Sequence, residues 1–279
     1  MSTMNRRTFT KSLIAGVATI SSTAAVQTVH GKSTSKPNIL IICSDQHSYK
    51  FAGYAGHPIV KTPNLDRIAR QGVVFSNAYC GAPVCVAGRA SLMTGVYASD
   101  VNSFCNSTVW DGSYPLWSTQ LRDQAGYKCW ATGKLDLSDK HDLGFNEAVE
   151  VRNGHESNPD LPSLFRRPLV FRYGRRDEIN GDIRTNNHGD VKLTQNTLEY
   201  LRRKKVQPWA AFIGFMQPHP PHRALEKYYQ MYPAADIPLP NIPAGHLDDL
   251  HLVYQAYRHY RNIATPIPEE RIRAAHAAY

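Results

Sequence analysis

Residues 37–47 read PNILIICSDQH, and this stretch decides the fold. The continuous run of apolar, largely β-branched residues from Ile39 to Cys43 is typical of a strand buried on both faces of a parallel sheet. Polar residues follow at its carboxyl end. Because ligands bind at the carboxyl ends of strands in open α/β sheets, Asp45 and Gln46 stand where a functional site is expected.

The rest of the chain alternates between helical and strand-like segments. A helix is expected to begin at Pro63 with Thr62 as its cap and to end at Gly72. The segment after it, residues 73–79, is expected to be extended. Further helices are expected at residues 116–124, 190–205 and from 269 onward, further strands at 128–132 and 209–215, and an irregular insertion at 154–187. The alternation predicts an α/β fold with a mixed, largely parallel sheet sandwiched by helices.

Composition and charge exclude several classes of protein. The chain has 279 residues, of which 42% are hydrophobic and 20% charged, which argues against disorder and against a membrane bundle. Part of the net charge of +9 lies near the N-terminus and part in an arginine-dense stretch. That stretch fits a solvated loop or a rim that attracts an anionic substrate. Since no nucleic-acid-binding motif accompanies it, we expect no nucleic-acid partner. Its arginines are Arg166, Arg167, Arg172, Arg175 and Arg176.

Residues 1–31 have the pattern of an export signal. The segment NRRTFTK at residues 5–11 resembles a twin-arginine box, and residues 12–29 are small and only mildly apolar. This run is too weakly apolar for a comfortable membrane span. We therefore expect export by the Tat translocase, cleavage between Ala25 and Gly31, and a periplasmic or secreted protein. A disordered basic N-terminus is the alternative.

The five cysteines are an odd number, so at least one must stay outside any intramolecular disulfide. No pair or cluster of Cys and His has the spacing of a structural zinc site. An odd thiol in an exported protein invites a chemical explanation.

Residues 83–95, PVCVAGRASLMTG, carry the most specific pattern. They resemble the signature of the formylglycine-dependent sulfatases, which is C/SxPxR followed by a small residue, Ser and an apolar residue. Matching segments at 62–66, 126–127, 133–134 and 218–221 extend the resemblance over residues 37–279. The start SDQH at residues 44–47 is similar to the choline-sulfatase and phosphonate-monoester-hydrolase branch. The resemblance implies an alkaline-phosphatase-like fold.

The resemblance assigns the central role to Cys85. In this family a maturase oxidises the cysteine to formylglycine (3-oxoalanine), and one hydroxyl of its hydrate attacks sulfur. The second hydroxyl then expels sulfate. A divalent cation, calcium with magnesium as the alternative, would be held by Asp45, Gln46 and the modified Cys85. Without the motif, a small buried hydrophobe would be the ordinary interpretation of Cys85.

Four further residues receive roles by resemblance. Arg89 would orient the hydrate, and a helix beginning near Arg89 would point its backbone N–H groups at the anion. Lys134 and His219 would bind the sulfate, and His219 would also protonate the leaving oxygen. His222 is a weaker candidate on the substrate side. The structural alternatives are a salt bridge for Arg89, a solvated Lys134, a loop hydrogen bond for Gln46 and a turn-fixing role for His219.

The chain departs from the family pattern in three ways. Ala87 replaces the usual Pro, which favours a radical SAM maturase. Asp136 stands where the family's GKxH motif has His, so the base for sulfate elimination stays open. No second metal-binding Asp-His pair and no second sulfate-binding lysine precede Tyr279. We therefore expect residues 36–279 to be the N-terminal portion of a catalytic domain, truncated at the C-terminus, that binds calcium weakly by itself.

Three functions remain open at this stage. The first is a sulfuric ester hydrolase acting on sulfate esters, with a sulfated carbohydrate and a choline-like ester as candidate substrates. The second is a phosphonate or phosphate ester hydrolase of the same superfamily. The third is an inactive truncated remnant.

Overall fold

A computed structural model describes residues 36–154, 182–183, 189–205, 208–260, 264 and 266–279. The chain divides into two units at Lys36, and the described helices and strands all belong to the second unit, Pro37–Tyr279. The expected export signal and the arginine-dense stretch lie outside the described residues. In the part that the structure describes, no helix is both long and apolar enough to cross a membrane.

Four parallel strands form the central sheet of the second unit. Their order is β1 (Ile39–Asp45), β5 (Trp209–Pro218), β2 (Lys128–Lys134) and β3 (Glu147–Arg152). The α/β class and the strands expected near residues 37–43, 128–132 and 209–215 are confirmed. The sequence did not reveal β3, because EAVEVR alternates charged and apolar residues and lacks the continuous apolar run of a buried parallel strand.

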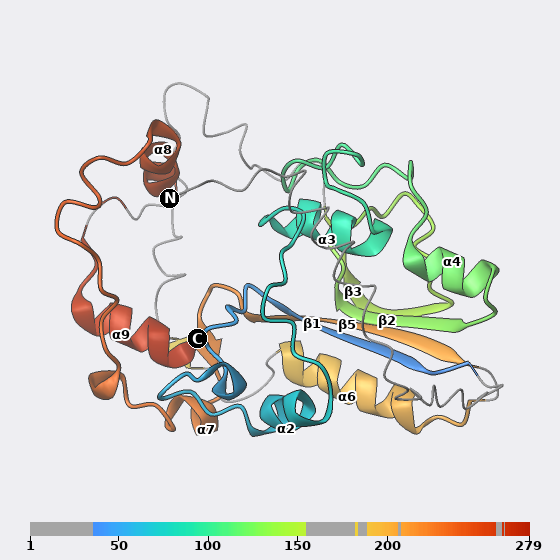
Figure 1. Ribbon diagram of the computed structural model, residues 1–279, viewed down its shortest axis with the longest axis horizontal. Coiled ribbons are helices and arrows are strands. Elements are labelled where there is room, and N and C mark those ends of the chain that lie inside the picture. Colours follow the sequence, from blue (N-terminus) through green and yellow to red (C-terminus); the bar gives the residue numbers. More distant parts are fainter. Residues whose placement is uncertain (1–35, 155–181, 184–188, 206–207, 261–263, 265) are drawn as a thin grey trace, which may run out of the picture. The chain divides into compact units, whose positions relative to one another are not determined.

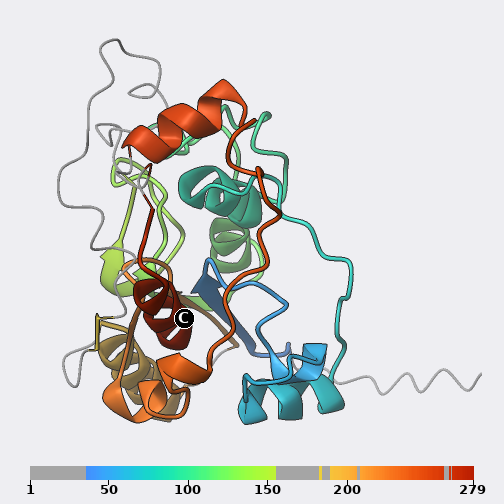
Figure 2. The same ribbon diagram turned by 90° about the vertical axis from the view of Figure 1, so that its left-hand side faces the viewer.

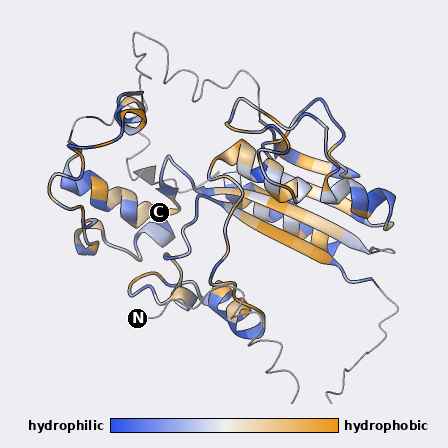
Figure 3. Cartoon of the chain, turned by 45° about the horizontal axis from the view of Figure 1, so that its top comes forward, coloured by the Kyte–Doolittle hydropathy of each residue, from blue (hydrophilic) through white to orange (hydrophobic). Residues whose placement is uncertain are grey.

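Helices cover both faces of the sheet (Figure 1, and turned by 90° in Figure 2). α3 (Cys85–Thr94) and α4 (Trp117–Asp123) lie over one face, and α6 (Gly189–Arg202) lies over the other. The core between α3, α4 and the sheet contains Met93, Leu116 and Phe212. On the α6 side, Trp130 stacks on Tyr200 with ring centroids 4.5 Å apart. Figure 3 shows that the strands between these helices are largely hydrophobic.

Shorter elements surround this layered core. The helices are α2 (Pro63–Gln71), α7 (Glu226–Tyr229), α8 (Leu252–Tyr260), α9 (Glu269–Ala278) and the 3-10 turns η1 (Gly53–Ala55) and η3 (Ala234–Asp236), and a small second sheet pairs β4 (Asp182–Ile183) with β6 (Arg223–Ala224). α4, α6 and α9 confirm the helices expected near residues 116–124, 190–205 and 269–279. Most of the expected insertion 154–187 lies outside the described residues.

In the described part of the chain β1 is covered on one face and exposed on the other, so the expectation that it is buried on both faces is wrong. Ile41 and Cys43 pack against the core, whereas Leu40 and Ile42 are 42% and 60% exposed. Among the described strands β1 pairs with β5 alone. A continuous apolar run therefore marks a parallel strand without showing how many of its faces are covered.

α2 has the predicted limits but not the predicted cap. It begins after Thr62 and ends before Gly72, yet the Thr62 hydroxyl makes no cap to a helix N–H. It donates instead to the Asp66 carboxylate at 2.7 Å and accepts the Gly53 N–H at 2.8 Å, which ties η1 to α2. Residues 73–79, expected to be extended, form neither a helix nor a strand.

Gly133 and Gly214 are register partners on the neighbouring strands β2 and β5. A Cβ on Gly214 would lie 2.0 Å from the Lys134 carbonyl oxygen. We predict that Gly214→Ala lowers the free energy of unfolding by about 2–4 kcal/mol, because backbone on both strands would have to shift. Urea denaturation measures this change. Gly189→Ala, where a Cβ meets open space, is the control and should change stability by less than about 1 kcal/mol. Equal urea midpoints for the two variants would contradict the proposed close approach.

Candidate active site

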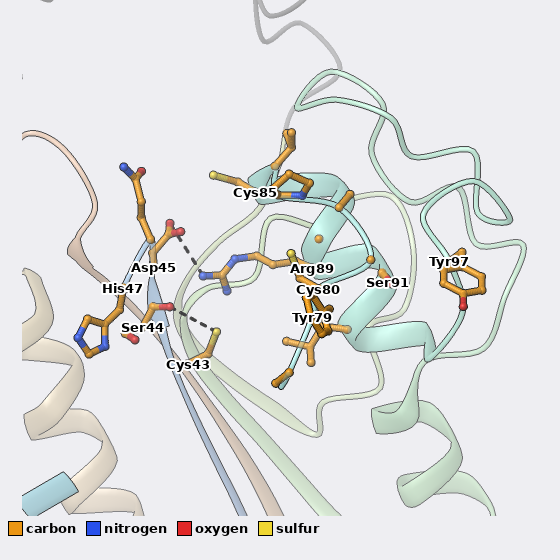
Figure 4. A pocket seen from close by; sticks show the side chains of 18 of the residues that line it. Cys43, Ser44, Asp45, His47, Tyr79, Cys80, Cys85, Arg89, Ser91 and Tyr97 are labelled. Atoms are coloured by element: carbon orange, nitrogen blue, oxygen red, sulfur yellow. Dashed lines mark hydrogen bonds and ion pairs between the residues drawn. The ribbon is translucent and has the colours of Figure 1, made fainter. Parts of the chain in front are cut away.

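The carboxyl ends of the parallel strands bring the predicted residues to one edge of the sheet. Asp45 ends β1, Lys134 ends β2 and His219 follows the last residue of β5. Above this edge α3 carries Cys85 and Arg89, and Figure 4 shows the Asp45 carboxylate and the Arg89 guanidinium pointing toward each other. These positions lie at the edge of the sheet where the sequence predicts a site.

α3 begins at Cys85, one turn earlier than the start predicted near Arg89. Val84 before it is extended, and the Val86 N–H donates to the Asn106 side-chain oxygen at 3.1 Å. The sequence could not indicate this start, because the residue that satisfies the first turn comes from 20 positions further along the chain. Cys85 therefore lies in the first turn of the helix, where backbone N–H groups favour an anion.

Four buried charged side chains meet beneath Cys85. The Lys134 ammonium forms ion pairs with Asp45 and with Asp136, the latter at 3.1 Å. Arg89 lies 4.0 Å from the Asp45 carboxylate and donates to the Lys134 carbonyl oxygen. Each of these residues is at most 8% exposed. Two cations and two carboxylates thus form a balanced cluster, which is the condition for burying charge at a tolerable cost.

The cluster keeps Lys134 positively charged. Burial lowers the pKa of Lys134, but the nearby Asp136, Cys85 and Asp45 raise it by more, so it lies above its ordinary value. The alternative of a solvated lysine is therefore wrong, since Lys134 is 2% exposed. In this structure its ammonium contacts carboxylates of the protein rather than open space.

Asp45, Cys85 and His219 form a candidate metal centre, because one ligand atom from each lies within 4.8 Å of the others. Gln46 follows Asp45, is exposed, and borders the same cavity with a left-handed φ of 60°. A carboxylate, an amide oxygen and, after modification, an oxygen on Cys85 fit a hard divalent cation in part. Calcium takes about 6–8 oxygen ligands, more than these residues offer.

His219 is held in one tautomer. Its Nδ1 lies 2.6 Å from the Pro220 carbonyl oxygen, which only accepts, so Nδ1 carries the proton. Burial and the Lys134 charge lower the pKa of His219 below its ordinary value. The ring is therefore neutral at neutral pH with a free lone pair on Nε2, and acting as an acid requires a nearby anion that favours the imidazolium.

His222 lies apart from the metal cluster. Its Nδ1 is 3.2 Å from the Pro218 carbonyl oxygen, and its ring packs against Tyr279 at 5.8 Å. The structure thus places His222 within the loop after β5, directly before β6.

A cavity of about 1180 Å³ opens between the end of β1 and the start of α3. Asp45, Gln46, Cys85 and Arg89 border it. Its size exceeds that of typical sites for small molecules, so it has room for a sugar-sized substrate. None of the five cysteines forms a disulfide, so the Cys85 thiol is available for chemistry.

We predict that Lys134→Met destabilises the metal-free protein by about 3–5 kcal/mol, because it leaves the buried Asp45 and Asp136 carboxylates without their shared cation. Chemical denaturation provides the measurement. Lys192→Met is the matched control, since Lys192 forms an exposed pair with Glu150 at 3.9 Å and should contribute less than about 1 kcal/mol. Similar losses of unfolding free energy in the two variants would show that the buried cluster stabilises the protein no more than an exposed ion pair does.

Comparisons with known proteins agree on one family. The family model described as Sulfatase matches residues 37–266. An ulvan-active sulfatase of Formosa agariphila is 32% identical over 74% of this chain and 40% of its own length. A choline-sulfatase of Rhizobium meliloti is 27% identical over 88% of this chain and 51% of its own length. This chain therefore spans about half the length of these relatives.

Solved structures share the fold. The phosphonate monoester hydrolase of Agrobacterium radiobacter superposes with a TM-score of 0.69 at 22% identity, over 87% of this chain and 55% of that one. A protein solved with its substrate D-glucosamine-2-N,6-O-disulfate gives a TM-score of 0.56 at 20% identity, over 77% of this chain and 40% of that one. The motif around Cys85, the parallel sheet and the family match together show that this chain belongs to the sulfatase family.

Proposed function

We propose that this chain carries the nucleophile-bearing part of a sulfuric ester hydrolase whose catalytic group derives from Cys85. The observation that carries the proposal is the position of Cys85, in the first turn of α3 and within 4.8 Å of Asp45 and His219. A purely structural cysteine has no need of a carboxylate and an imidazole beside it, nor of an open cavity in front of it.

Conversion of Cys85 to formylglycine replaces sulfur by oxygen at Cβ. The balanced change is thiol plus water giving aldehyde plus hydrogen sulfide, two protons and two electrons, and a radical SAM maturase would accept the electrons. When hydrated, the aldehyde supplies the hydroxyl nucleophile that a sulfate ester requires. The Ala87 position of the motif favours this class of maturase.

A divalent cation, calcium with magnesium as the alternative, would polarise the sulfate oxygens when bound. Asp45, Gln46 and the modified Cys85 would hold it, with further ligands beyond this set. Asp45 also pairs with Lys134. The cation and Lys134 therefore compete for one carboxylate, and metal binding would leave Lys134 freer to contact sulfate.

The remaining residues position charge around the sulfate. Arg89 would orient the hydrate from the second turn of α3, and His219 would donate a proton to the leaving oxygen once the bound anion favours its imidazolium. His222 would lie toward the substrate. Asp136 already pairs with Lys134, and the group that assists sulfate elimination is not assigned.

A sulfated carbohydrate is the substrate that we propose. One relative is an ulvan-active sulfatase, and one protein of similar fold was solved with a sulfated glucosamine as its substrate. The cavity size agrees with a sugar. The choline-sulfatase relative favours a small choline-like ester instead. Residues 1–31 would act as a twin-arginine signal for the Tat translocase and deliver residues 36–279, part of the catalytic domain, to the periplasm or outside the cell.

Peptide mass spectrometry tests the modification. When the protein is made with a competent radical SAM maturase, we predict that the peptide containing Cys85 loses about 18 Da, the difference between a thiol and an aldehyde side chain. Cys85→Ala should show no such loss and no turnover, with an unchanged fold by circular dichroism. An active preparation in which Cys85 stays an ordinary, alkylatable thiol would contradict the mechanism.

The phosphonate monoester hydrolase fold match favours a second candidate, which is hydrolysis of a phosphonate or phosphate ester. We predict that the matured protein cleaves an aryl sulfate faster than an aryl phosphonate, and that Asp45→Asn and chelation of divalent cations both reduce the rate. A colorimetric release assay measures all of these. A faster phosphonate reaction would favour the second candidate, and no turnover of either ester would favour an inactive remnant.

A further inference from the structure

We propose that Tyr279 is a positioning residue that fixes the loop after β1, residues 46–51, and thereby the direction of Gln46. We name this segment the Gln46 loop. Its link to metal binding rests on the proposed function, whereas its effect on the loop itself does not.

The Tyr279 hydroxyl bridges two peptide groups of the Gln46 loop. The Ser48 N–H donates to the hydroxyl oxygen at 2.7 Å, and the hydroxyl donates to the Gln46 carbonyl oxygen at 2.7 Å. These two groups lie on either side of His47. One side chain thus sets the orientation of consecutive peptide planes in the loop that leaves β1.

The Gln46 loop needs such support because Gln46 has a φ of 60°. Left-handed conformations cost a non-glycine residue about 1–2 kcal/mol and persist where the surroundings hold them. Two other hydrogen bonds of the loop involve its far end. The Phe51 N–H donates to the Ser48 carbonyl oxygen at 3.0 Å, and the His47 Nε2 lies 3.0 Å from the Phe51 carbonyl oxygen. Among the hydrogen bonds of the described residues, that of Tyr279 is the one that reaches the Gln46 carbonyl.

Tyr279 is itself held firmly. Its ring packs edge-on against Phe51 at 4.9 Å and against His222 at 5.8 Å. It follows α9, whose Ala275, Ala277 and Ala278 are buried. Burial raises the pKa of Tyr279, although the Ser48 N–H lowers it in part, so the hydroxyl keeps the proton that it donates. Tyr279 therefore joins α9, the loop after β5 and the Gln46 loop.

The consequence concerns Gln46, because it follows Asp45 directly and borders the same cavity as Cys85. Gln46 is held in a left-handed conformation, and a change of its φ would alter the direction of its Cα–Cβ bond relative to Asp45. A hydroxyl that holds the Gln46 carbonyl therefore helps to fix the Gln46 backbone, and with it the direction in which the side chain leaves the chain, before a metal binds. Such preparation lowers the cost of ordering on metal binding.

Tyr279→Phe tests the proposal, since it removes the hydroxyl and keeps the ring. Tyr232→Phe is the matched control. The Tyr232 hydroxyl accepts the Lys61 N–H at 3.0 Å, and neither residue borders the cavity. We expect Tyr279→Phe to speed hydrogen exchange at the Ser48 amide roughly tenfold or more. We also expect it to raise the calcium concentration for half-maximal thermal stabilisation by roughly fivefold, the equivalent of one net hydrogen bond. The control should accelerate exchange at Lys61 and leave the calcium requirement unchanged.

Two results would overturn the proposal. Unchanged Ser48 exchange in Tyr279→Phe would show that the hydroxyl does not hold the loop. Faster exchange with an unchanged calcium requirement would reduce Tyr279 to a structural residue. Asp45→Asn separates these failures from failure of the proposed function. If Asp45→Asn leaves calcium binding intact, the metal assignment is wrong, and the Ser48 exchange rate still decides whether Tyr279 fixes the loop.

Discussion

The buried ion pair between Lys134 and Asp45 constrains the rest of this structure. Each charge would cost several kcal/mol if buried without a partner, so the ends of β1 and β2 must meet for either to be stable. β5 lies between those strands, and its Gly214 permits the close approach of the Lys134 backbone. Arg89 then ties α3 to both, through Asp45 and the Lys134 carbonyl. Charge pairing thus fixes where Cys85 lies relative to the sheet.

The same pairing shapes what the site can bind. Asp45, Asp136, Arg89 and Lys134 together carry no net charge, so the cluster by itself attracts a sulfate ester only weakly. A divalent cation that engages Asp45 adds positive charge and removes a partner from Lys134 at the same time. Both effects favour an anion near Cys85. Cation and sulfate binding should therefore be positively linked, as two ligands are when each favours the same arrangement of shared groups.

The sequence was sufficient for features that a single segment encodes. The apolar run that precedes Asp45 and the run that precedes His219 predicted the parallel strands and the edge that carries the candidate site. Features that depend on distant partners could not be predicted. The start of α3 depends on Asn106, the exposed face of β1 depends on what packs on it, and the role of Tyr279 depends on bonds across 231 and 233 positions. No local pattern encodes such contacts.

Asp136 shows how one departure from the family pattern changes the balance of the site. It occupies a left-handed position with a φ of 49°, which an Asp side chain tolerates better than most. The N–H groups of Leu135 and Asp136 both donate to the Arg152 carbonyl oxygen, at 2.8 and 3.0 Å, so β3 fixes this turn. A carboxylate held there pairs with Lys134 and remains its partner after a cation takes Asp45. Under the proposed function, Lys134 would then meet a sulfate with part of its charge already neutralised, and the metal and Arg89 would have to neutralise more of the sulfate charge.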